Sequence, residues 1–162
     1  MSSFSSEDIT HMQRVLVLAS LGQGEVAPNP MVGCVIAKGH KIIGEGWHQR
    51  YGEAHAERNA VAQVKDTTQL AGSTVYVNLE PCSHFGKTPP CCELLIECRV
   101  GRVAISTPDP NPLVNGAGIE RLRQAGIQVD IGLLAEEALE LNHRFFQQIN
   151  ERIRDSNDHS AL

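Results

Sequence analysis

One histidine and two cysteines stand at the spacing of a metal site in the middle of the chain. His55 lies two positions before Glu57, Cys82 follows Pro81, and Cys91 comes nine positions after Cys82. Imidazole and thiolate are ligands that Zn²⁺ prefers, and a catalytic zinc site uses three protein ligands and leaves a fourth position to water. Zinc lowers the pKa of that water to about 7, so a neighbouring carboxylate can move its proton. The sequence therefore predicts a hydrolytic zinc centre with His55, Cys82 and Cys91 as ligands and Glu57 as proton shuttle.

The elements that must position these residues can be predicted from hydrophobic periodicity. It indicates helices over residues 7–21, 55–64, 90–98, 119–125 and 134–153, and strands over residues 32–37, 41–47, 74–79, 102–106 and 127–131. Strands that alternate with helices after an opening hairpin indicate an α/β fold of three layers, a mixed five-stranded sheet with helices on both faces. His55 and Cys91 then fall in the first turns of two helices, where a helix N-terminus stabilises the thiolate form of cysteine. Cys92 should point away from the metal, because adjacent helix residues lie about 100° apart.

Length and composition limit the remaining possibilities. The 162 residues suit one domain, which we place at residues 1–153, followed by a polar C-terminal tail at residues 154–162. The net charge of −5 and the lack of a basic block disfavour nucleic acid as a partner. The sequence has no apolar run of about 18 residues, which disfavours a membrane protein, and no secretory signal at its start. Five cysteines, an odd number, then favour reduced thiols in the cytoplasm.

The cluster is part of a longer pattern that resembles a known family. The order His-x-Glu, Pro-Cys, Cys is typical of zinc deaminases that act on nucleobases. The segment 79–91 reads Leu-Glu-Pro-Cys-Ser-His-Phe-Gly-Lys-Thr-Pro-Pro-Cys. With His55-Ala56-Glu57 it closely resembles the deaminase domain of the bacterial riboflavin-biosynthesis deaminase/reductase, a member of the cytidine deaminase-like superfamily. Most nucleobase deaminases of the superfamily carry Cys-x-x-Cys, and the longer insert is typical of the riboflavin branch. Segments 28–33, 46–48, 109–112 and 125–127 are also similar to that family.

The resemblance implies a cytidine deaminase-like fold and a specific reaction. That reaction is the zinc-dependent hydrolytic deamination of 2,5-diamino-6-ribosylamino-4(3H)-pyrimidinone 5′-phosphate, which yields the 5-amino-6-ribosylaminouracil 5′-phosphate and ammonia. The resemblance also implies substrate contacts from Asn29, His48, Ala56, His84, Lys87, Asp109 and Asn111. From side-chain chemistry alone, Asp109 and Asn111 are better explained by hydrogen bonds within their own loop, and Lys87 suits either role.

The sequence also departs from the usual family member, which is bifunctional. In that family the deaminase domain runs into a reductase domain that uses a nicotinamide cofactor, whereas this sequence has no Gly-x-Gly-x-x-Gly fingerprint. We therefore expect no reductase activity. The chain is either a separate deaminase, with the reductase as a separate pathway partner, or a truncated piece of a bifunctional enzyme, and its polar tail rich in Ser, Asn, Asp and His favours the former. We also expect a homo-oligomer. The apolar face of the last helix could pack on the sheet or on another subunit, and it contains Leu139, Phe145, Phe146 and Ile149.

Three other functions compete with this interpretation. The chain could deaminate a related pyrimidine in secondary metabolism, or adenosine in tRNA. The acidic balance and the long insert disfavour tRNA. A non-catalytic zinc module is a third alternative, but structural zinc sites normally have four protein ligands. Here three are evident, and Glu57 is placed for chemistry.

Overall fold

The computed structural model describes residues 4–86, 88–112 and 114–160. Its helices and strands follow one another in the order α1 (Ser6–Ser20), β1 (Gly33–Lys38), β2 (Lys41–Trp47), α2 (Ala56–Ala62), the 3-10 helix η1 (Thr67–Leu70), β3 (Thr74–Leu79), α3 (Cys91–Glu97), β4 (Arg102–Thr107), α4 (Ala117–Gln124), β5 (Gln128–Ile131), α5 (Ala135–Leu141) and α6 (His143–Ser160). None of the helices in these ranges is long and apolar enough to cross a membrane.

The strands form one mixed sheet in the order β2-β1-β3-β4-β5. Strand β1 is antiparallel to both β2 and β3, whereas β3, β4 and β5 run parallel. The hairpin between β1 and β2 turns at Gly39, whose φ of 62° lies in the left-handed region that glycine adopts without steric cost. The predicted five-stranded α/β architecture is confirmed, and the carboxyl ends of β3 and β4 meet at one edge of the sheet.

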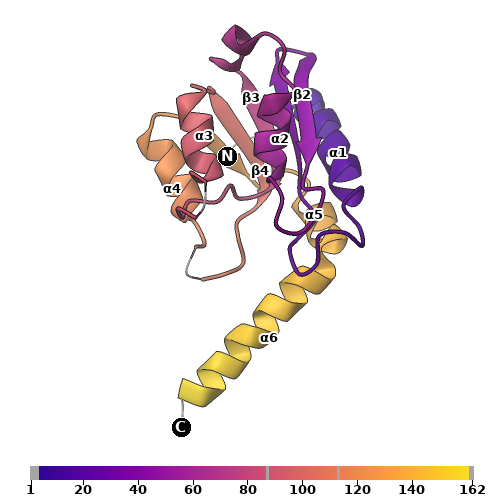
Figure 1. Cartoon of the computed structure of the whole chain (residues 1–162), viewed down its shortest axis with the longest axis vertical. Coiled ribbons are helices and arrows are strands. Elements are labelled where there is room, and N and C mark those ends of the chain that lie inside the picture. The colour runs from indigo at the N-terminus through magenta and orange to yellow at the C-terminus, as the bar shows by residue number, and fades with distance from the viewer. Residues whose placement is uncertain (1–3, 87, 113, 161–162) are drawn as a thin grey trace.

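Helices cover both faces of the sheet (Figure 1). Helices α2, α3 and α4 pack on one face, where a core forms around Ile36, Val77, Leu95 and Ile105. Helices α1 and α5 cover the other face, where Met12 and Val15 pack against the sheet. Because α2 and α3 lie on the same face and contact each other, their N-termini are neighbours.

Helix α1 is fastened to the sheet through a buried carboxylate. Asp8 is 6% exposed and accepts hydrogen bonds from Tyr76 Oη at 2.7 Å and from two guanidinium nitrogens of Arg102 at 2.9 and 3.1 Å. It also caps the helix by accepting the Ser5 backbone N–H. Burial alone raises the pKa of Asp8, but the hydrogen bonds from Arg102, Tyr76 and Ser5 outweigh burial and hold the pKa well below its usual value.

We expect Asp8→Asn to destabilise the fold by about 1–3 kcal/mol at neutral pH, because the Arg102 guanidinium and the Tyr76 hydroxyl lose a charged hydrogen-bond acceptor. Arg102 keeps its other ion pair, with Asp130 at 2.8 Å, which limits the loss. The pKa of Asp8 is lower in the folded state, so its charge stabilises the fold fully above the unfolded pKa of about 3.9. The contribution is lost as the pH falls towards the folded value. Urea unfolding of both proteins as a function of pH should therefore show a difference that shrinks below about pH 4.

Glu45→Gln is the matched control, because Glu45 pairs with Arg14 on the surface, where both side chains are 29% exposed or more. This substitution should cost less than about 1 kcal/mol. Equal losses for the two variants, or a loss for Asp8→Asn that persists at low pH, would contradict the assignment.

The end of the chain differs from the sequence prediction. An unbroken helix over residues 134–153 was expected, but α5 ends at Leu141, and α6 begins at His143 and continues to Ser160. Residues 154–160, predicted as part of a polar tail, are thus helical, and a domain boundary after residue 153 stays a prediction. Helix α6 extends away from the body of the molecule (Figure 1).

Candidate active site

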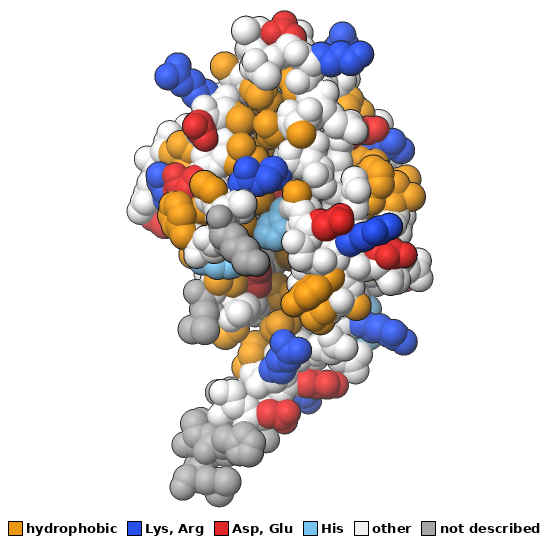
Figure 2. All heavy atoms as spheres, in the orientation of Figure 1, with side chains coloured by type: hydrophobic (Ala, Val, Ile, Leu, Met, Phe, Trp, Pro, Cys, Tyr) orange, Lys and Arg blue, Asp and Glu red, His pale blue; other side chains and the backbone are white. Residues whose placement is uncertain are grey.

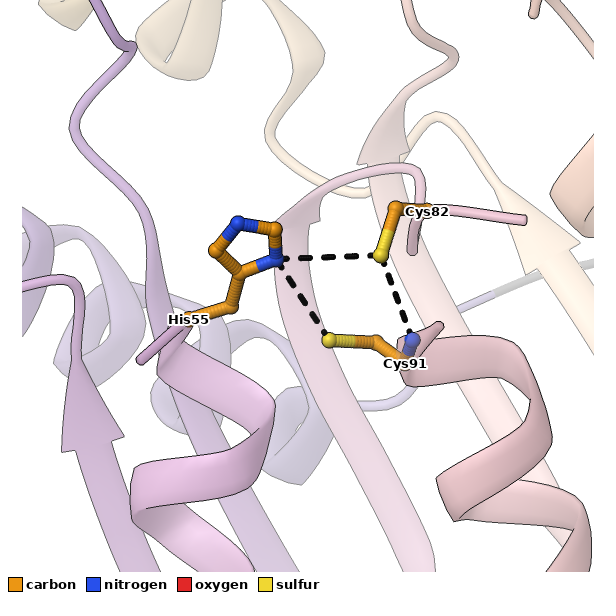
Figure 3. Close-up of side chains that lie close together, drawn as sticks. All are labelled: His55, Cys82 and Cys91. Atoms are coloured by element: carbon orange, nitrogen blue, oxygen red, sulfur yellow. Dashed lines mark hydrogen bonds between the residues drawn. The ribbon is translucent and has the colours of Figure 1, made fainter. Parts of the chain in front are cut away.

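Three element junctions bring the predicted metal ligands together. His55 is the N-cap of α2, Cys82 lies in the loop after β3, and Cys91 is the first residue of α3. The imidazole and both sulfurs point towards one another between the two helix N-termini (Figure 3). The ligand atoms of all three residues lie within 4.8 Å of one another, so residues up to 36 positions apart form one cluster.

The distances in this cluster fit a tetrahedral zinc ion. His55 Nδ1 lies 3.7 Å from Cys82 Sγ and 3.6 Å from Cys91 Sγ. Zinc bonds of about 2.3 Å to sulfur and about 2.0–2.1 Å to nitrogen, at the tetrahedral angle, place the two ligand atoms about 3.6 Å apart. The donor set and its spacing therefore match what zinc requires.

The local charges favour a metal-binding thiolate. The pKa of Cys82 is lowered to about 4, chiefly because the Cys91 side chain donates a hydrogen bond to it, with further help from His55 and from the Cys91 backbone N–H at 3.2 Å. The pKa of Cys91 is raised for the same reason, since its thiol proton is held by Cys82. The pair thus carries one thiolate at neutral pH, and thiolate is the form that binds metals.

Glu57 lies in the first turn of α2 and is only 4% exposed. Burial raises the pKa of its carboxyl group to about 7, and the nearby negative charge of Cys82 adds to this effect. A carboxyl group with a pKa near the working pH can both accept and donate a proton. Glu57 lines the same pocket as His55 and Cys82.

The cluster opens into a pocket of about 430 Å³. Six of the seven substrate contacts implied by the resemblance line this pocket: Asn29, His48, Ala56, His84, Asp109 and Asn111. The seventh, Lys87, lies outside the described residues. Figure 2 shows histidine side chains in the hollow, with charges of both signs around it. The pocket collects these residues, and their contact with a substrate stays a prediction.

Three of the pocket residues make specific side-chain hydrogen bonds. The Asn29 amide nitrogen donates to His48 Nε2 at 3.1 Å, and the other His48 nitrogen, Nδ1, donates to the Ala54 carbonyl at 3.1 Å. Asp109 uses one carboxylate oxygen to accept the Asn111 backbone N–H at 2.9 Å. Asp109 thus shapes its own loop, as its side-chain chemistry alone had indicated, and its contact with a substrate stays a prediction.

The other cysteine beside the cluster is not part of it. The Cys92 thiol is fully buried and donates to the backbone carbonyls of Pro81 and Gly118, at 3.3 and 3.5 Å. The prediction that Cys92 points away from Cys91 and its partners is confirmed.

Glu80 has a role in the site that could not be predicted from the sequence. Its buried carboxylate accepts four backbone N–H groups of the loop and helix start that follow β4. The donors and distances are Asp109 at 3.0 Å, Gly116 at 3.0 Å, Gly118 at 2.7 Å and Ile119 at 3.3 Å. The loop that carries Asp109 and Asn111 is therefore fixed by Glu80. Its one sequence signal is an acidic residue directly after a buried strand.

We expect Glu80→Gln to destabilise the protein by about 1–3 kcal/mol, because the amide NH₂ would face backbone donors and leave some of them unsatisfied. Urea unfolding measures this loss, and limited proteolysis should cut the loop over residues 108–116 faster. Glu93→Gln is the matched control, since Glu93 pairs with Arg121 at a more exposed position and should cost less than about 1 kcal/mol. Equal stability of the two variants would contradict the role of Glu80.

The fold and the site together define a class of protein, the zinc-binding nucleotide deaminases. The model of the family described as "Cytidine and deoxycytidylate deaminase zinc-binding region" matches residues 5–107, which include all three predicted ligands and Glu57.

Curated relatives and solved structures are similar over most of the chain. The chain is 48% identical over 143 residues to the diaminohydroxyphosphoribosylamino-pyrimidine deaminase of Buchnera aphidicola subsp. Schizaphis graminum. This alignment covers 88% of this chain and 96% of the relative. The chain is 50% identical to the riboflavin biosynthesis protein RibD of Escherichia coli over 88% of this chain, but spans only 38% of that protein. The crystal structure of a deaminase/reductase from Thermotoga maritima superposes with a TM-score of 0.86 and 43% identity, covering 90% of this chain and 42% of that one. The chain belongs to the cytidine and deoxycytidylate deaminase family, in the branch of these riboflavin-pathway deaminases.

Proposed function

We propose that the chain catalyses the hydrolytic deamination of 2,5-diamino-6-ribosylamino-4(3H)-pyrimidinone 5′-phosphate in riboflavin biosynthesis. The observation that carries this proposal is the convergence of His55, Cys82 and Cys91 at zinc distances beside the buried carboxyl of Glu57, in one pocket. The Buchnera relative, of which the chain covers nearly the whole length, is named for a deaminase of this kind.

The chemistry divides between a metal and the residues around it. When bound by His55, Cys82 and Cys91, zinc supplies a water that loses its proton near pH 7. Glu57 accepts the proton of the attacking water and delivers it to the ring nitrogen next to the reacting carbon. The water oxygen thereby forms a C–O bond to this carbon. Glu57 then takes the remaining proton of the added hydroxyl group and passes it to the leaving amino group, so that the hydroxyl becomes the product carbonyl, the C–N bond breaks and ammonia departs. The burial of Glu57 keeps this proton from bulk water.

The pocket walls suit the rest of this substrate. Asn29 and Asn111 each carry an amide, which can donate to and accept from base edges or ribose hydroxyls. His48 donates through Nδ1 to Ala54, so its Nε2 faces Asn29 and helps orient that amide. Lys87 and His84 belong to the insert between the two cysteine ligands, where the Lys87 cation suits a phosphate and His84 can add a hydrogen-bond donor. These contacts are part of the proposal.

Ammonia release from the purified, zinc-loaded protein tests the proposal. The diaminopyrimidine ribotide should release ammonia, and mass spectrometry of the product formed in ¹⁸O-labelled water should show one oxygen from water. Cytidine, dCMP and tRNA serve as alternative substrates, and only the ribotide should be turned over efficiently. Efficient deamination of one of the others, with an inert ribotide, would favour a competing function.

The remaining predictions concern location and partners. The Thermotoga relative is named as both a deaminase and a 5-amino-6-(5-phosphoribosylamino)uracil reductase. We propose that a reductase of this kind consumes the product, and a separate reductase as pathway partner stays a prediction. A homo-oligomer, a cytoplasmic location and the absence of a nucleic-acid partner stay predictions.

A further inference from the structure

Helix α6 contributes to the pocket although it extends away from the body. Phe145 and Ile149 line the same pocket as Glu57, and both side chains are half-buried. Residues four positions apart lie on one face of a helix, so the two side chains form a continuous apolar strip at the root of α6. Figure 2 shows hydrophobic side chains where α6 leaves the body. From the sequence, these residues were expected to pack on the sheet or on another subunit.

We propose that α6 is the apolar wall of the substrate pocket and that Phe145 and Ile149 are specificity-determining residues. This inference rests on the proposed function and names the part of the substrate that the wall contacts. The attacking water approaches the reacting carbon along the normal to the ring, so one ring face must look towards Glu57. The other face of the pyrimidine is apolar and needs a cover. Among the described lining residues, Phe145 carries the one phenyl ring.

A hydrogen-bonded clamp sets the position of this wall. Asn142, between α5 and α6, is 5% exposed and binds both backbone groups of Met31. Its Oδ1 accepts the Met31 N–H at 2.8 Å, and its Nδ2 donates to the Met31 carbonyl at 2.8 Å. Met31 directly follows Asn29 and Pro30, which line the pocket. Asn142 therefore fixes the start of α6 relative to the loop that carries Asn29, and it is a positioning residue.

The position of Phe145 and Ile149 in the sequence indicates a role in substrate specificity and not in the proton transfers. The family model covers residues 5–107, which hold the predicted ligands and Glu57, whereas α6 begins at His143. The wall is thus separate from the zinc-binding region that this chain shares with other deaminases. Removing it should weaken substrate binding and leave the proton transfers in place.

Steady-state ammonia release by Phe145→Ala and Ile149→Ala variants tests the wall. Loss of apolar contact in a binding pocket is worth roughly tenfold or more, so we expect KM for the ribotide to rise by about tenfold for Phe145→Ala. The kcat should stay within about twofold, because an interaction made equally in ground and transition states affects KM alone. Phe145→Leu should restore most of the affinity. Zinc content, measured by elemental analysis, should not change.

Phe146→Ala is the matched control. Phe146 is the next residue on the same helix, its ring contacts that of Phe145 with centroids 5.7 Å apart, and it does not line the pocket. The KM of the Phe146→Ala variant should change less than about threefold, since this substitution removes no pocket contact. If Phe145→Ala and Ile149→Ala raise KM no more than Phe146→Ala does, the inference is wrong, while activity of the wild type still supports the proposed function.

Asn142→Leu tests the clamp. This variant should raise KM more than a core variant of equal thermal stability, such as Val129→Ala on β5, which is remote from the pocket lining. If the Asn142→Leu and Val129→Ala variants have equal KM values, Asn142 contributes to stability alone and is not a positioning residue. Calorimetric titration with the deaminated ribotide provides a second readout. If the wild type binds this product, Phe145→Ala should weaken binding even if no ammonia is released, which separates a failure of the wall from a failure of the proposed reaction.

Discussion

Replacing Glu57 with glutamine should lower kcat for ammonia release by about 10²–10⁴-fold, the usual contribution of a positioned general acid–base. Glutamine keeps the volume of the buried side chain but cannot accept or deliver a proton. The Glu57 carboxyl group also lines the pocket beside the predicted metal ligands, and it is almost fully buried. The measurement is a steady-state rate with the ribotide, combined with elemental analysis for zinc.

Two controls isolate the proton transfer from other effects. Glu57→Gln should bind zinc and product as the wild type does, because the three ligands are unchanged. Glu137→Gln, at an exposed position in the first turn of α5, should have wild-type kcat. Ammonia release at the wild-type rate by a zinc-loaded Glu57→Gln protein would show that another group moves the protons, and the proposed mechanism would be wrong.

Local sequence patterns were sufficient to predict most of the architecture. Strands β2 and β3 have the predicted bounds, Lys41–Trp47 and Thr74–Leu79, because β-branched residues and flanking glycines mark strands and turns without reference to the rest of the chain. The predicted zinc ligands, which the structure brings into one cluster, could be singled out because metal binding requires particular residue types near element junctions. These signals depend on neighbours in sequence.

The features that the sequence did not predict depend on contacts between distant segments. The predicted last helix is divided into α5 and α6 at Asn142. The Asn142 side chain binds the backbone of Met31, which lies 111 positions away in the sequence. No periodicity within residues 134–153 indicates such a partner. The role of Glu80 depends on backbone N–H groups 29 to 39 positions later in the chain. Folding onto the sheet brings each of these groups together, so only the three-dimensional arrangement identifies them.

The paired cysteines at the start of α3 allow a sharp test of the metal centre. We expect Cys91→Ser to lose zinc and, with it, ammonia release, because the substitution replaces a predicted thiolate ligand with a hydroxyl, which is a poor ligand for zinc. Cys92→Ser should keep zinc and most of the activity. Its hydroxyl can donate to the same carbonyls, Pro81 and Gly118, that accept from the Cys92 thiol. Both side chains are buried, so the two substitutions disturb packing to a similar degree.

Thermal unfolding of the same proteins separates metal binding from packing. A ligand that binds only the folded state stabilises it by about 3 kcal/mol at a hundredfold excess over its Kd. For a chain of this size, the melting temperature of the wild type should therefore fall by about 5–10 °C when zinc is chelated. The apo protein should remain folded, because its core does not depend on the metal. Cys92→Ser should show the same response to chelator as the wild type, and Cys91→Ser should show none. A chelator response in Cys91→Ser equal to that of the wild type would mean that the stabilising metal binds elsewhere, and the assignment of His55, Cys82 and Cys91 would fail.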